Sequence, residues 1–63
     1  MDDFRSRLIA ESMELKDRLA KLRDFINGKK FRHLDRRDRE LLYQQQGIMS
    51  AYNDVLEQRL ARW

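Results

Sequence analysis

Asn27-Gly28 and Asp35 frame the single break between two long helical patterns, and this break limits the possible folds more than any other feature of the sequence. Glycine adopts the left-handed conformation that ends many helices, so the sequence predicts a helix end near Ile26 with a left-handed Gly28. The Asp35 carboxylate can accept hydrogen bonds from the next turn, with Asp38 as an imperfect capping-box partner. A helix end and a helix start this close together predict an antiparallel two-helix hairpin.

The segment before the break carries a heptad seam. Leucines recur every seven residues, and a second row follows each of them by four residues, with one polar position at Ser12. This spacing predicts an amphipathic helix over about residues 3–26. The two rows are Leu8, Leu15 and Leu22, and Ser12, Leu19 and Ile26.

The segment after the break carries three neighbouring heptad rows and predicts a helix over about residues 36–62. The rows are Leu42, Met49, Leu56 and Trp63; Leu41, Ile48 and Val55; and Gln45, Tyr52 and Arg59. A stripe three rows wide exceeds what one antiparallel helix can cover. We therefore expect an all-α homo-oligomer, most simply a dimeric four-helix bundle, with a monomer that exposes apolar surface as the alternative. The expected oligomer interface comprises Leu41, Gln45, Ile48, Met49, Tyr52, Val55 and Leu56.

Three residues of this second segment raise separate questions. Gln45 is expected to point into the bundle, where a buried amide can fix the register of the helices. Gly47 is unfavourable in a helix interior, so it is either incidental or a point where a partner approaches. Trp63 is expected to pack near the start of the first helix or, if exposed, to serve recognition.

The turn over residues 27–35 and the start of the second helix concentrate positive charge. Residues 29–39 hold six basic and two acidic side chains, a net charge of +4 in a chain whose total is +3. We expect Phe31 to close the core and Leu34 to act as a hydrophobic staple, with Phe31 as a partner anchor as the alternative. The expected site for a partner or an anion comprises Lys29, Lys30, Arg32, Arg36 and Arg37.

Composition argues against several other classes of protein. The 63 residues form a single domain, contain no cysteine and contain one histidine, so neither a disulfide, a metal site nor a cofactor is expected. His33 has no candidate nucleophile near it, and a two-helix chain offers no concave catalytic site, so we do not expect an enzyme. No apolar run approaches the ~20 residues that span a bilayer, so we expect a cytoplasmic protein without a membrane partner.

A longer set of spaced positions resembles a family of small, uncharacterised helical-hairpin proteins encoded by tailed phages and prophages. The resemblance covers almost the full length, and its more specific part is the polar set Arg7, Glu11, Gln45, Tyr52 and Arg59. The remaining positions are Phe4, Leu15, Leu19, Leu22, Phe25, Ile26, Phe31, Leu34, Leu41, Leu42, Met49, Val55 and Leu56. The resemblance implies an accessory phage protein that acts on host machinery or host defence.

Three functions are compatible with these features. The first is a binding module that inhibits a host or host-defence protein through its basic tip, since electrostatic attraction steers such encounters. The second is an oligomeric binder of an anionic ligand, either nucleic acid or a nucleotide signal, because Arg36 and Arg37 lie in a first helical turn. The third is a structural or scaffold component.

Overall fold

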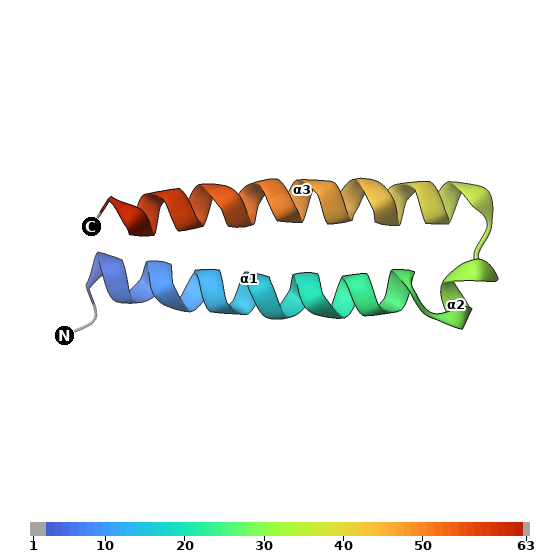
Figure 1. Ribbon diagram of the computed structural model, residues 1–63, viewed down its shortest axis with the longest axis horizontal. Helices are drawn as coiled ribbons and strands as arrows, with labels where there is room; N and C mark the ends of the chain where they lie inside the picture. The colour runs from blue at the N-terminus through green and yellow to red at the C-terminus, as the bar shows by residue number, and fades with distance from the viewer. Residues whose placement is uncertain (1–2, 63) are drawn as a thin grey trace.

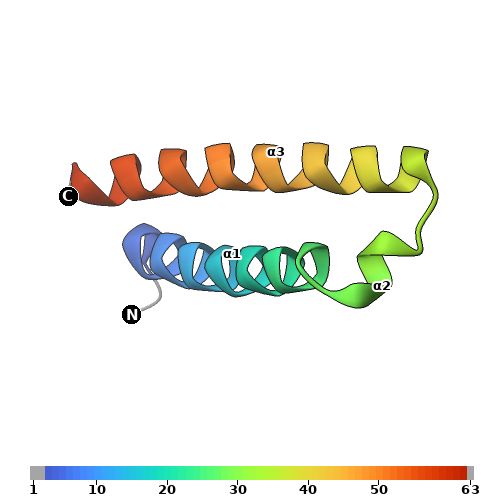
Figure 2. The ribbon, with the colours of Figure 1, turned by 45° about the vertical axis from the view of Figure 1, so that its right-hand side comes forward.

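Two long antiparallel helices lie side by side in the computed structural model, which describes residues 3–62 (Figure 1). Helix α1 spans Phe4–Ile26, the short helix α2 spans Lys29–Arg32, and α3 spans Arg36–Ala61. No strand occurs in residues 3–62, so the all-α prediction is confirmed. The hairpin is long and narrow, with extents of 46 × 17 × 13 Å. A second view, turned by 45°, also shows that α2 lies across the end of the hairpin where α1 and α3 are joined (Figure 2).

Both long helices begin at an aspartate cap. The Asp3 carboxylate accepts a hydrogen bond from the Ser6 backbone N–H at 2.7 Å, and Asp35 accepts one from Asp38 N–H at 2.8 Å. Each bond satisfies one of the N–H groups that a first turn leaves without a partner. The Asp35 cap is therefore confirmed.

Gly28 corrects the expected ending of the first helix. Its φ and ψ are −91° and 173°, and neither glycine has a positive φ, so the predicted left-handed conformation is wrong. Asn27 ends α1 in a right-handed conformation, and Gly28 takes the extended backbone of an N-cap because a new helix, α2, begins at Lys29. The Gly28 N–H also donates to the carbonyl of Phe25 at 3.0 Å, which holds the turn against α1.

The core is thin and follows the predicted seam. Leu8, Leu15 and Leu56 form one buried cluster, against which Met49 and Leu60 pack. The core also contains Leu19 and Phe31, together with Ser12, the predicted polar position, which is 2 % exposed. The Ser12 hydroxyl has no hydrogen-bond partner among the residues described.

The predicted oligomer interface is divided between the inside and the outside of the single hairpin. Leu56 and Met49 belong to the hairpin's own core. Gln45 is exposed, and its amide lies 3.8 Å from the Met49 sulfur. The remaining residues of the predicted interface are exposed on α3, namely Leu41, Ile48, Tyr52 and Val55. Assembly through these side chains stays a prediction. Trp63 lies outside the described residues.

Candidate functional site

The structure divides the five predicted site cations into two sets. Lys29, Lys30 and Arg32 are exposed on α2 and form no ion pair with a described residue. Arg36 and Arg37, in the first turn of α3, converge instead on the carboxylate of Glu40.

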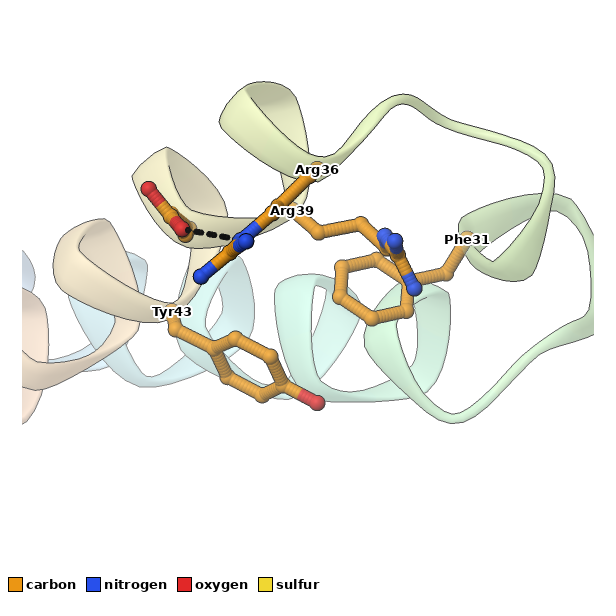
Figure 3. Close-up of a pocket in the computed structure, with 5 residues that line it drawn as sticks. Phe31, Arg36, Arg39 and Tyr43 are labelled. Atoms are coloured by element: carbon orange, nitrogen blue, oxygen red, sulfur yellow. Dashed lines mark hydrogen bonds and ion pairs between the residues drawn. The ribbon is translucent and has the colours of Figure 1, made fainter.

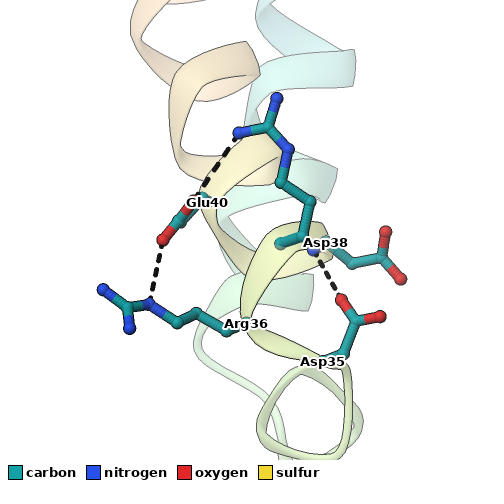
Figure 4. A network of polar contacts seen from close by, with 5 residues as sticks. Asp35, Arg36, Asp38 and Glu40 are labelled. Carbon is teal, nitrogen blue, oxygen red and sulfur yellow. Dashed lines mark hydrogen bonds and ion pairs between the residues drawn. The ribbon is translucent and has the colours of Figure 1, made fainter.

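Glu40 holds the second set together. Its Oε1 lies 3.1 Å from Arg36 Nε, and its Oε2 lies 3.6 Å from Arg37 Nη1. Figure 4 shows the Arg36 contact beside the Asp35 cap that starts the helix. The three side chains are neighbours because they are three or four residues apart on one helix. Because one carboxylate faces two guanidinium groups, these three side chains together carry a net charge of +1.

A hollow of about 280 Å³ opens beside this cluster, between α2 and α3 (Figure 3). Four of its lining residues come from α3, at positions that place them on one side of that helix, and the fifth comes from α2. The lining residues are Phe31, Arg36, Arg39, Glu40 and Tyr43.

Aromatic rings form the apolar part of the hollow. Phe31 is 6 % exposed, which confirms that it closes the end of the core. Its ring meets Tyr43 edge to face at 5.3 Å and 80°, and meets Phe25 at 6.4 Å and 86°. Tyr43 is held by this contact yet is 56 % exposed. The Tyr43 ring is therefore both positioned and accessible to a ligand.

Arg39 supplies a cation that no described carboxylate neutralises. Its side chain is half-buried, and its Nε is shielded from solvent without a hydrogen-bond partner among the described residues. Because this shielded nitrogen is out of reach of a ligand, the part of Arg39 that a ligand in the hollow can contact is the rest of its side chain, which lines the hollow. Two or more guanidinium groups beside an exposed ring can bind a phosphate or carboxylate attached to a planar group.

Reasoning from the sequence missed Arg39 and Tyr43 as site residues. A signal was present, because Arg36, Arg39 and Tyr43 are spaced three and four residues apart and so share a helix side. The sequence spacing did not indicate that Phe31 also lines the hollow, because its contact with Tyr43 depends on where α2 lies.

The polar set of the family resemblance gathers mainly near the chain ends. Arg7, Glu11 and Arg59 line a hollow of about 150 Å³ with Phe4 and Leu8, and the Arg59 guanidinium lies 5.7 Å from the centre of the Phe4 ring. A neighbouring hollow of about 250 Å³ shares Glu11. It is lined by Glu11, Glu14, Leu15, Arg18 and Tyr52.

Residues 3–62 contain no group of three or more His, Cys, Asp and Glu side chains that could hold a metal ion. Within the same range, neither long helix has the length and apolar character needed to cross a membrane.

Comparison with known proteins identifies a family for this chain. A family model described as Sequestin matches residues 2–62. Neither the comparison with curated proteins nor the comparison with solved structures gave a match.

Proposed function

The chain belongs to the Sequestin family, and on that premise we propose that it acts without catalysis, by binding and withholding an anionic ligand that carries a planar ring. The family name indicates a sequestering, and therefore binding, role. A nucleotide is the ligand class that combines a phosphate with such a ring. If a phage encodes the protein, as the resemblance implies, it would inhibit its host by lowering the free concentration of that ligand.

Arg39 is the observation that carries this proposal. Its side chain lines the same hollow as the exposed ring of Tyr43, and it forms no ion pair with a described carboxylate. A hydrogen bond to a charged group contributes about 1.5–3 kcal/mol, and a base stacked on an aromatic side chain contributes about 1–3 kcal/mol. A ligand that makes both contacts is therefore favoured over one that makes only one of them.

The single exposed ring and the short basic surface favour a mononucleotide over a nucleic acid. Tyr43 is the only exposed ring among the residues that line the hollow. Proteins that track a nucleic-acid strand present several stacking rings along a continuous basic groove. Here Glu40, Asp35 and Asp38 are interspersed among the basic residues, so the positive surface is short.

Isothermal titration tests the proposal with a nucleoside monophosphate, the corresponding nucleoside and inorganic phosphate. We expect the nucleotide to bind most tightly, because it alone uses both kinds of contact. Arg39→Gln should weaken its binding at least about tenfold, which corresponds to ~1.4 kcal/mol. Arg5→Gln, at the other end of the hairpin, is the matched control and should leave binding unchanged. Equal affinities of wild type and Arg39→Gln for the nucleotide would refute the proposed site.

A host protein with an acidic surface is the second candidate. Lys29, Lys30 and Arg32 are exposed on α2 and do not line the hollow, so they present a separate basic surface. Recovery of proteins from host lysate by wild type, but not by a Lys29→Glu/Lys30→Glu/Arg32→Glu variant, would favour this candidate. Recovery of the same proteins by both would exclude α2 as the contact.

A further inference from the structure

We propose that two copies of the chain associate through one side of the hairpin, in antiparallel orientation, so that their basic tips lie at opposite ends of the dimer. The surface, called here the apolar face, consists of Phe4 of α1 with Leu41, Ile48, Tyr52 and Val55 of α3. The occupant is a second copy of the same face. This inference does not depend on the nucleotide site.

The apolar face lies on one side of the hairpin, where charged side chains of the α1–α3 junction border it. Leu41, Ile48 and Val55 are spaced seven residues apart, so they form one row along α3. Tyr52 lies beside this row and lines a hollow with Glu11 of α1. Glu11 also lines the adjoining hollow that contains Phe4, so the two hollows form a furrow along the same side of the α1–α3 junction.

The exposed fractions along this face are large for apolar side chains. Ile48 is 63 % exposed, Phe4 56 % and Val55 52 %, and Leu41 and Tyr52 are each 43 % exposed. The opposite side of the hairpin is different, because there Lys16 and Glu57 join α1 to α3 through an ion pair of 3.2 Å. On that side Met13, three residues before Lys16, is 66 % exposed and Ile9, one turn before it, is 40 % exposed, so α1 carries there a pair of apolar side chains, fewer than the apolar face.

The elongated chain exposes more surface than a compact monomer of its mass, by an amount comparable with one side of a protein interface. The chain exposes 5262 Å² of surface. A compact folded monomer of 7.8 kDa is expected to expose about 4,400 Å². The excess of roughly 900 Å² is close to the ~800 Å² that each partner buries in a standard protein interface.

Charge distribution selects the antiparallel orientation. Residues 29–39 carry a net charge of +4, which leaves −1 for the rest of a chain whose total is +3. Parallel pairing would bring two such tips together, and like charges repel at short range. Antiparallel pairing places each tip beside the weakly negative remainder of its partner.

Sedimentation equilibrium on the full chain tests the surface. We expect a mass of twice 7.8 kDa for wild type and for Met13→Gln, and the mass of a single chain for Ile48→Gln. Met13→Gln is the matched control because it also replaces an exposed apolar side chain, but outside the apolar face. A wild type that stays monomeric at several hundred micromolar, or equal dissociation of the two variants, would overturn the proposal.

A distance measurement tests the orientation and leaves the apolar face intact, so it remains decisive even if Ile48→Gln does not fold. The chain has no cysteine, so His33→Cys introduces a single thiol at the tip for a spin label. Antiparallel pairing predicts a label-to-label distance comparable with the 46 Å length of the hairpin. A distance near its 17 Å width would show that the tips lie together and would overturn the proposal.

Discussion

Asp3 shows how one exposed side chain makes the stability of a helix depend on pH. The pKa of its carboxyl is lowered from 3.8, first because the Ser6 backbone N–H donates to it and then because of the Ser6 side chain. A lowered folded-state pKa means that the folded chain binds fewer protons than the unfolded chain as the pH approaches 3.8 from above. The contribution of Asp3 to stability is therefore complete above pH 3.8 and is lost as the pH falls through its folded-state value.

We predict that the start of α1 frays in acid because of this group. NMR titration of the Asp3 side-chain carboxyl should give a pKa below 3.8, and the Ser6 amide should exchange faster with solvent over the same pH range. Asp3→Asn is the control, because its amide oxygen still accepts the capping hydrogen bond but does not titrate. If the Ser6 amide of Asp3→Asn showed the same acid dependence, a group other than Asp3 would be responsible.

At the scale of the element, α3 contains a residue that weakens it without an apparent benefit to the single hairpin. Gly47 lies in the middle of the helix, and a Cβ placed there would meet nothing within 4 Å. Glycine in a helix interior is unfavourable by about 1 kcal/mol relative to alanine. Gly47 also lies outside the apolar face, on the side of α3 that points away from α1.

Gly47→Ala should therefore raise the free energy of unfolding of the protein by roughly 0.5–1 kcal/mol. Urea denaturation followed by circular dichroism measures the change, and Gln44→Ala on the same helix is the control, with an expected change near zero. Sedimentation of Gly47→Ala should be the same as that of wild type. Loss of association in this variant would instead mean that a partner's backbone approaches α3 at Gly47.

The elements themselves were largely predictable from the sequence because the signals that define them are local. The Asp35 cap and the heptad spacing of Leu8 and Leu15 each depend on a few neighbouring residues. Helix α2 was not predicted, because four residues are too short to show a helical period, and its basic composition indicated a loop.

The candidate site could be predicted only in part for a related reason. Arg36 was identified from its place in the first turn of α3, and it does line the hollow. The hollow also needs Phe31 against Tyr43, a contact between residues that are twelve apart in the sequence and are brought together by α2. No periodicity of the sequence encodes that contact.

At the scale of the whole molecule, the core of one hairpin is small for the chain it must hold. The buried apolar side chains of residues 3–62 are Leu8, Leu15, Leu19, Phe31 and Leu56. A chain of 63 residues buries only about 60 % of the surface that it exposes when unfolded, which leaves its stability marginal. If pairing through the apolar face supplies part of the missing burial, folding and association are coupled, and stability depends on protein concentration.

This coupling has a predicted size. Unfolding gains about 2.1 cal/mol/K of entropy per residue, which for two chains of 63 residues is roughly 0.26 kcal/mol/K. A tenfold rise in concentration stabilises a dimer against unfolded monomers by ~1.4 kcal/mol, so the melting temperature should rise by about 5 °C. Thermal melts at 5, 50 and 500 µM, chosen as roughly tenfold steps, measure this slope. Met13→Gln should keep the slope and Ile48→Gln should flatten it. A flat slope for wild type, in a protein that sediments as a dimer, would mean that the hairpin is stable before it pairs and that its thin core is sufficient alone.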